Sequence, residues 1–262
     1  MSLPPKYTAK LASRRVLVLG GTSGVGFCVA EAALEHGATV IISSSNPTKL
    51  SNALSRLNPT ASLPVTANVC DLGSPDTVEA NIQSLLAFAT DSGRHPLDHV
   101  VFTAGDPLDT PRVEDATPAS VMKLFQVRFL AAAMLAKALP GFIKKEASSS
   151  VTLTGGTNTD RPMPGWAFVA GVGAAIEGLM RGLAVDMKPV RFNVVSLGAV
   201  QTELWGGLEG EALEGFVEAL RRQTLTEEVG RPEDVAEAYL YCMKDRFVTG
   251  EVVKTNGGRM LV

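Results

Sequence analysis

The sequence predicts an α/β fold in which helices cover both faces of one parallel sheet, and three observations predict it. Short apolar runs alternate with helical patterns along the chain, as in doubly wound parallel sheets. The chain has 262 residues, of which 45% are hydrophobic and 19% charged, which suits one domain with a well-buried core. A glycine-rich turn joins the first apolar run to the first helical segment. We therefore predict a single Rossmann-type domain.

The glycine-rich turn lies between the apolar run at 16–19 and a helical segment at 27–36. Glycine lets the chain turn sharply and lets a pyrophosphate approach the backbone, while the helix N-terminus offers N–H groups and a positive dipole. A tight turn without a ligand is the alternative interpretation. The flanking strand and helix favour dinucleotide binding, with contacts expected from Gly20, Thr22, Ser23, Gly24, Val25 and Gly26.

The other elements follow in the order that a doubly wound sheet requires. We expect strands at 38–43, 63–69, 99–103, 150–154, 191–196 and 251–255. We expect one helix that ends at 57 and others at 75–90, 118–139, 167–187 and 232–243. Residues 201–226 are amphipathic and interrupted by glycines, and residues 1–13 are expected to be an extension to a domain at 14–262. No linker or repeat divides the chain.

Charge, cysteine content and hydropathy argue against several classes of function. The net charge of -3 gives no reason to expect nucleic acid or an anionic membrane as a partner. Cys28, Cys70 and Cys242 lack the spacing of metal ligands, so we expect no metal site and reduced, buried thiols. The N-terminus resembles no signal peptide, and no run reaches transmembrane length. We expect a cytoplasmic protein.

The end of the second strand predicts which dinucleotide binds. Enzymes that prefer NAD usually place an acid there to bind the ribose 2′-OH, whereas this chain has serines at 43–45. Ser44, Ser45, Asn46 and Lys49 would instead accept a 2′-phosphate. The alternative is that these polar residues only form the turn before a helix. The missing acid favours NADPH under either interpretation.

Several segments together resemble the short-chain dehydrogenase/reductase family over nearly the whole chain after Arg14. The glycine-rich turn, residues 102–105, residues 196–202 and the stretches at 230–236 and 249–251 match family motifs in order. The resemblance adds implied cofactor contacts at Asn68, Val69, Ala104, Gly105, Gly198, Val200 and Thr202. It also implies a homotetramer or homodimer built on the helices that begin at 118 and 167.

The polar residues by which this family reduces carbonyl groups are replaced. In the register that the resemblance implies, Gly155 stands for the serine, Phe168 for the tyrosine, Val172 for the lysine and Arg128 for the asparagine. Neither phenylalanine nor valine can protonate an alkoxide, so we expect no ordinary ketone or alcohol chemistry. Two hypotheses follow. One is a non-catalytic dinucleotide-binding protein, and the other is hydride transfer to a substrate that needs no proton, such as an iminium ion.

A narrower resemblance favours the iminium. The segment at 161–166, with Arg128 and the replaced residues, resembles the fungal reductase/Diels–Alderases of prenylated indole alkaloid biosynthesis, of the malbrancheamide, paraherquamide and citrinadin type. This implies NADPH-dependent reduction of a cyclic iminium, followed by intramolecular Diels–Alder closure to a bicyclo[2.2.2]diazaoctane. Met163 stands where that group has an aspartate. Reduction of another activated C=N or C=C bond remains an alternative.

An apolar pocket is expected beside the cofactor. Phe102, Met163, Trp166 and Phe168 are its candidate walls, although apolar residues more often belong to the core. Arg128 is the candidate to orient the cofactor ribose or a substrate amide oxygen, with an ion pair elsewhere as the alternative.

Acidic loops and a lid are expected at the mouth of this pocket. Asp106, Asp109 and Asp160 are either solvated or stand in for the charge absent at Met163. Residues 201–226 lie where the family carries its substrate lid, and an ordinary packed helix pair is the alternative. The apolar residues of this segment are Leu204, Trp205, Leu208, Leu213, Phe216 and Leu220.

Overall fold

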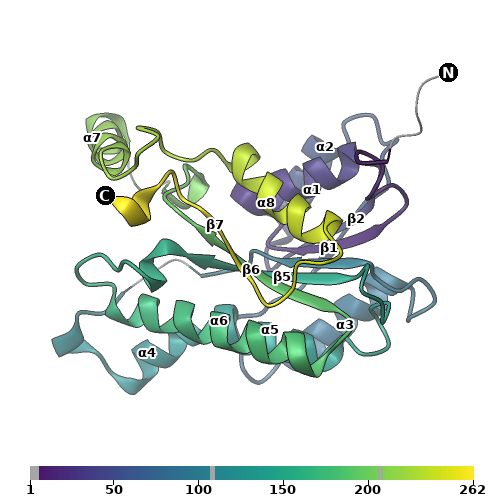
Figure 1. Cartoon of the computed structure of the whole chain (residues 1–262). Helices are drawn as coiled ribbons and strands as arrows, with labels where there is room; N and C mark the ends of the chain where they lie inside the picture. Colours follow the sequence, from purple (N-terminus) through teal and green to yellow (C-terminus); the bar gives the residue numbers. More distant parts are fainter. Residues whose placement is uncertain (1–5, 107–109, 206, 208) are drawn as a thin grey trace.

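The computed structural model describes residues 6–106, 110–205, 207 and 209–262, and it confirms the predicted fold. Seven strands, all paired in parallel, form one sheet in the order β3-β2-β1-β4-β5-β6-β7 (Figure 1). The strands are β1 Arg15–Leu19, β2 Thr39–Ser44, β3 Val65–Val69, β4 His99–Phe102, β5 Ser150–Gly156, β6 Arg191–Leu197 and β7 Val252–Thr255. The order reverses between β1 and β4, where doubly wound sheets bind ligands.

Helices cover the two faces of the sheet in separate layers (Figure 1). One layer holds α1 Gly24–Glu35, α2 Pro47–Leu57 and α8 Pro232–Lys244. The other holds α3 Val78–Thr90, α4 Pro118–Phe125, α5 Ala132–Ala138 and α6 Ala167–Asp186. A further helix, α7 Gly210–Arg221, stands apart from both layers, next to the C-terminus.

The alternation of side chains along each strand creates one core on each face. In β1, Val16 and Val18 pack in the core under α1, α2 and α8, whereas Leu17 and Leu19 pack in the core under α3 to α6. All four side chains are fully buried. Both faces of a parallel sheet are covered, so its strands are near-continuous apolar runs. Leu11, from the expected N-terminal extension, is buried in the first of these cores.

The helix expected at 118–139 is interrupted. It consists of α4, a π-helical turn at Gln126–Ala131 and α5. The N-terminus is capped as the sequence suggests, because Thr117 and Ser120 form a capping box before an apolar face. The π-helical turn adds a residue and changes which side chains face the sheet, and such turns are frequent at functional sites. The predicted continuous helix was wrong in this respect.

Several further boundaries differ by one to three residues from the predictions, and two of them have a clear cause. Helix α3 begins at Val78 rather than 75, because the N–H groups of Thr77 and Val78 donate to the Ser74 carbonyl in a preceding turn. Strand β5 continues beyond the expected end at 154, because Gly155 and Gly156 still pair with β6. This extension changes where the residues after β5 leave the sheet.

Two segments are long and apolar enough to cross a membrane by length and composition alone. They are Pro118–Ala138 and Ala167–Asp186. The prediction that no run reaches this length was therefore wrong. Both segments contribute to the core that packs on the sheet, with Leu124 and Val127 from the first and Ile176 from the second. Core helices of globular proteins pass the same test.

Candidate functional site

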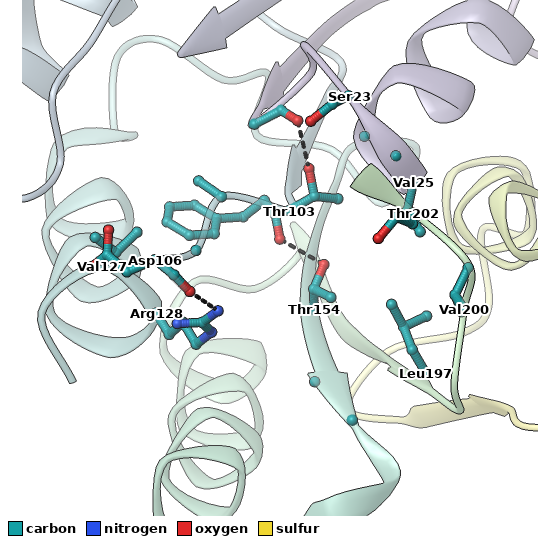
Figure 2. Close-up of a pocket in the computed structure, with 18 of the residues that line it drawn as sticks. Ser23, Val25, Thr103, Asp106, Val127, Arg128, Thr154, Leu197, Val200 and Thr202 are labelled. Atoms are coloured by element: carbon teal, nitrogen blue, oxygen red, sulfur yellow. Dashed lines mark hydrogen bonds between the residues drawn. The ribbon is translucent and has the colours of Figure 1, made fainter. Parts of the chain in front are cut away.

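A cavity of about 1070 Å³ opens at the carboxyl ends of the strands. Its walls come from the segments that follow β1 to β6, with α6, α7 and the C-terminal turn completing it. Figure 2 shows the part of this cavity around Thr103, Arg128 and Thr154, with Leu197, Val200 and Thr202 on the opposite side. The strands therefore deliver residues distant in sequence to one place, as parallel sheets do.

The predicted glycine-rich turn is tightly packed against the segment after β4. Gly20 has φ +86°, and a Cβ built on it would lie 2.7 Å from the Ala104 backbone nitrogen. A Cβ on Gly26 would lie 2.3 Å from the Gly20 carbonyl oxygen. Thr103 Oγ1 donates a hydrogen bond to the Leu19 carbonyl oxygen at 2.9 Å, which ties the two segments together. These contacts require glycine, and the turn lines the cavity at the N-terminus of α1, which suits a pyrophosphate.

The N-terminus of α1 already carries a carboxylate. The Gly24 N–H donates to Glu203 Oε2 at 2.9 Å, and both residues line the cavity. Glu203 belongs to a 3-10 turn at Glu203–Trp205, inside the expected lid. An anion here is stabilised by the unpaired amides and the helix dipole. The same amides are those expected to bind the pyrophosphate.

The predicted phosphate-binding residues gather at the far end of the cavity. Ser44, Ser45, Asn46 and Lys49 all line it. Asn46 also caps α2, because its Oδ1 accepts from the Lys49 N–H at 2.9 Å. The turn-forming interpretation is thus confirmed for Asn46, while the Lys49 side chain is exposed at the cavity. A dinucleotide fits this donor set, with the lysine able to face a 2′-phosphate.

The predicted adenine contacts lie at the border of the cavity. Asn68 and Val69 are the last two residues of β3 and are not among the lining residues, and Val69 is 50% exposed. Cys70, Asp71 and Leu72, which follow the strand, line the cavity instead. The available signal was the carboxylate of Asp71 directly after an apolar strand.

Arg128 is placed at the cavity by the π-helical turn. Its Nη2 donates to the Asp106 backbone carbonyl at 2.5 Å (Figure 2). A Cβ on Gly105 would lie 2.6 Å from that Nη2, so the guanidinium packs directly on the segment after β4. Burial lowers the pKa of Arg128, and the negative charge of Asp106 opposes that shift. Among the described residues, no carboxylate forms an ion pair with Arg128. The alternative interpretation, an ion pair elsewhere in the structure, is therefore not supported.

The register of α6 differs by one residue from the prediction. Val169 and Gly173 line the cavity, whereas Phe168 packs against the core and Val172 is buried in it. A shift of one residue rotates the side chains by about 100° around the helix axis, so Phe168 and Val172 face the core instead of the cavity. Phe168 as a cavity residue is therefore corrected to Val169. Gly156 and Gly155 both line the cavity at the end of β5.

Position 173 has no room for a side chain. A Cβ there would lie 2.0 Å from Thr159 Oγ1, and Thr159 itself lines the cavity. The hydroxyl fills the space into which a residue on this face of α6 would project. Neither Val169 nor Gly173 carries an ionisable group, so this wall cannot supply a proton.

The other residues predicted as pocket walls do line this cavity. Phe102, Met163 and Trp166 line the cavity, although Phe102 is only 3% exposed. Trp205 and Phe216 from the expected lid also line it, with their rings at 5.2 Å in an edge-to-face arrangement. Aromatic pairs of this kind contribute packing beyond their buried area.

The acidic candidates have different surroundings. Asp160 pairs with Lys254 at 2.6 Å, whereas Asp106 lines the cavity beside Arg128. Asp109 and Leu208 lie outside the described residues, as does the side chain of Leu204. Sequence reasoning did not identify Thr157, Asn158 and Arg259, which also line the cavity.

The cysteines and histidines form no metal site among the described residues, where no group of three or more possible ligands occurs. Cys28, Cys70 and Cys242 are free thiols. Burial raises the pKa of each thiol to about 11, so all three are protonated at neutral pH. Cys70 and Cys242 are buried as expected, whereas Cys28 is only partly buried.

Comparison with known proteins places the chain in a family. The model of the SDR-like Rossmann domain matches residues 7–262. "Short-chain dehydrogenase/reductase malC" of Malbranchea aurantiaca is 43% identical over 257 residues, covering 96% of each chain. "Short-chain dehydrogenase/reductase fsr5" of Gibberella fujikuroi is 42% identical over 261 residues, covering 98% of each chain.

Solved structures agree with this assignment. The structure described as the MalC reductase/Diels-Alderase from Malbranchea aurantiaca superposes with a TM-score of 0.93 at 42% identity, covering 98% of this chain and 100% of that one. A short-chain dehydrogenase from Burkholderia cenocepacia in complex with NADP shares the fold, with a TM-score of 0.82 at 20% identity over 96% of this chain and 99% of that one. The chain belongs to the short-chain dehydrogenase/reductase family and is an NAD(P)-dependent oxidoreductase of that family.

Proposed function

We propose that the protein is an NADPH-dependent imine reductase of a fungal indole alkaloid pathway that also guides an intramolecular Diels–Alder closure. The observation that carries the proposal is the wall formed by Val169 and Gly173. Carbonyl reduction needs a proton donor at this wall, whereas an iminium is already cationic and becomes a neutral amine on hydride addition alone. The 43% identity to malC supports the same reaction class.

NADPH is the proposed cofactor. The glycine-rich turn would hold its pyrophosphate, Lys49 and the hydroxyls of Ser44 and Ser45 its 2′-phosphate, and Asp71 with Leu72 would lie at the adenine. Gly198, Val200 and Thr202 would lie at the carboxamide. NADPH, when bound, supplies a hydride from C4 of its nicotinamide.

The chain's own residues then orient the substrate and exclude water. Arg128 fixes the segment after β4 through the Asp106 carbonyl, so the loop beside the nicotinamide is held in one position. Phe102, Met163 and Trp166 form an apolar wall that favours a folded prenylated substrate. Holding the two reacting ends together contributes on the order of 7–11 kcal/mol in favourable intramolecular reactions.

Residues 201–226 are proposed to be the substrate lid. Trp205, Phe216 and Leu220 line the cavity from this segment, which supports the lid over an ordinary helix pair. Helix α7 of this segment stands apart from the two helix layers (Figure 1). Closure over a large apolar ligand would exclude water from the reacting iminium.

The test is NADPH oxidation by the purified protein with a prenylated indole dipeptide iminium, followed by analysis of product chirality. One bridged enantiomer is expected. A racemic bridged product would remove the cyclase role and leave a reductase. NADPH binding without oxidation would favour a non-catalytic dinucleotide-binding protein or a reductase of another activated C=N or C=C bond.

We further propose a homodimer or homotetramer in the cytoplasm, assembled through α4 and α6. Met122 and Val185 on these helices are 65% and 70% exposed, and apolar exposure on neighbouring helices marks interfaces. Light scattering coupled to size exclusion is expected to give a multiple of the 27.6 kDa chain mass. Val185→Lys is expected to lower that multiple, whereas Phe247→Lys, at an exposed residue elsewhere, is not.

A further inference from the structure

Arg259 lines the cavity and has no role in the proposed hydride transfer. It begins the 3-10 turn Arg259–Leu261 that follows β7, and it is only 5% exposed. Its Nη1 donates to Thr157 Oγ1 at 3.2 Å, and its Nε has no hydrogen-bond partner. A guanidinium buried this far normally has an acceptor for each of its donors.

The surroundings of Arg259 do not balance the positive charge of its guanidinium. In the described part of the chain, no carboxylate lies within ion-pair distance of its guanidinium. Arg161 donates to its backbone carbonyl, which brings a second cation close. Asp160, beside Arg161 in sequence, pairs with Lys254. Burial, together with the positive charge of Arg161, lowers the pKa of Arg259. A buried cation without a partner destabilises the ligand-free fold.

A second buried polar atom without a partner lies in the same wall. Asn158 follows Thr157 in the 3-10 turn after β5, and its Oδ1 has no hydrogen-bond partner. Asn158, Thr157 and Arg259 all line the cavity. The wall therefore contains a buried donor and a buried acceptor that both lack partners, next to the end of β5.

We propose that Arg259 and Asn158 form a subsite for a secondary amide of the substrate. Arg259 donates to the amide carbonyl oxygen, and Asn158 accepts from the amide N–H. This deepens the proposed function and rests on it only for the identity of the reacting molecule. A small ring that contains an amide must hold it in the cis form, which presents its C=O and N–H on one side.

A carboxylate fits this subsite less well. Carboxylates bind arginine through two parallel hydrogen bonds along one edge of the guanidinium. In Arg259 the Nη1 donates one hydrogen bond to Thr157 and the Nε has no partner, so the donors of the guanidinium alone do not exclude a carboxylate. A single carbonyl oxygen needs one donor only. Asn158, with an acceptor to satisfy, favours a ligand that also carries an N–H.

The test measures binding of piperazine-2,5-dione, a six-membered ring with two secondary amides, to the NADP⁺-loaded protein by ligand-observed NMR. The N,N′-dimethyl derivative keeps the carbonyl groups and lacks the N–H groups. Wild type is expected to bind the dione more tightly than the derivative. Arg259→Met is expected to lower the affinity for the dione about 10- to 100-fold, the range for a hydrogen bond to a charged group. Arg246→Met, at an exposed arginine outside this cavity, is expected to leave binding unchanged.

Thermal unfolding without ligand separates this role from a structural one. Arg259→Met is expected to keep or raise the Tm of the ligand-free protein, because it removes an uncompensated buried charge. A lower Tm with unchanged dione affinity would overturn the inference, and so would absence of dione binding to wild type. If Arg259→Met does not fold, Arg259→Lys, which keeps the charge and loses the guanidinium, takes its place and is expected to weaken dione binding relative to wild type. Dione affinity equal to that of wild type would then overturn the inference.

Neither readout involves reduction. A protein that binds the dione through Arg259 but never oxidises NADPH with the iminium would uphold this inference and overturn the proposed function. Iminium reduction by a protein whose dione affinity is the same with and without Arg259 would uphold the proposed function and overturn this inference.

Discussion

Thr159 fills the space that a side chain at position 173 would need, and this contact explains the composition of the α6 wall. The Oγ1 of Thr159 lies 2.0 Å from where a Cβ on Gly173 would be. A larger residue at 173 therefore requires a change at 159 as well. Because the contact joins α6 to the turn after β5, it also fixes which residues of α6 face the cavity.

Gly173→Ala is expected to destabilise the protein by about 1–3 kcal/mol, the cost of overpacking. Thr159→Ala removes the hydroxyl that clashes, so the double variant is expected to recover most of this loss. Chemical denaturation of the four proteins measures the coupling between the two positions.

Gly215→Ala is the matched control for this pair. It lies inside α7, where nothing lies within 4 Å of a new Cβ. It is expected to stabilise by up to about 1 kcal/mol through helix propensity. Equal destabilisation by both alanine substitutions would contradict the steric explanation.

Lys49 is expected to set the preference between the two dinucleotides. Lys49→Glu places a carboxylate where a 2′-phosphate would bind, so the ratio of NADPH to NADH affinity is expected to fall about 10- to 100-fold. Fluorescence titration with each dinucleotide measures the ratio.

Lys145→Glu makes the same change of charge at an exposed residue outside the cavity. Its affinity ratio is expected to equal that of wild type. A similar fall for both variants would assign the preference to net charge rather than to Lys49.

At the scale of elements, the 3-10 turn at Glu203–Trp205 meets the N-terminus of α1. Glu203 accepts from the Gly24 N–H, at the amides proposed to bind a pyrophosphate. The carboxylate and a phosphate cannot occupy this N–H together. A pyrophosphate bound at this N–H would therefore displace the Glu203 side chain.

Glu203→Gln is expected to tighten NADPH binding about two- to fivefold, the range for one charge at a helix N-terminus. The glutamine keeps the size of the side chain and removes the competing anion. Glu211→Gln, an exposed acid in the first turn of α7, is the control and is expected to leave the Kd unchanged. Weaker binding by Glu203→Gln would show that the glutamate helps to hold the cofactor.

At the scale of the whole molecule, a buried histidine makes the fold sensitive to acid. His99 is the first residue of β4, the central strand of the sheet, and it is 2% exposed, with its Nδ1 2.9 Å from Ser150 Oγ. Burial lowers the pKa of His99 from 6.5 to about 3. The folded protein therefore holds a neutral imidazole across a pH range in which the unfolded chain binds a proton.

The free energy of unfolding is expected to fall as the pH drops from about 6.5 toward 3, because the unfolded state binds the extra proton in this window. The slope approaches about 1.4 kcal/mol per pH unit for one such group. Urea denaturation between pH 7 and 4.5 measures it.

His99→Asn, whose amide group takes the place of the ring Nδ1, is expected to reduce the slope of the free energy of unfolding against pH. His95→Asn, at an exposed histidine, is the control and is expected to keep the wild-type slope. The pKa of Asp98 is lowered by Lys144 and Arg14, although burial opposes this, so its contribution is lost only at pH below about 3.9 and does not obscure the His99 window.

The sequence by itself determined the class of fold, the glycine-rich turn and most of the residues that line the proposed cofactor end of the cavity. Those features depend on local rules: apolar runs between helices, glycine where backbones touch, and polar residues at strand ends. Leu19, Gly20 and Gly26 illustrate this, because their roles follow from the strand, the turn and the helix that contain them.

Only the tertiary structure decided which side chains share the cavity at its substrate end. The one-residue register of α6 depends on its packing against Thr159 and on the length of β5, neither of which has a local signal. The π-helical turn that places Arg128 is likewise a product of packing. Arg259 lies 102 residues from its partner Thr157, and only the closing of the sheet brings the two together.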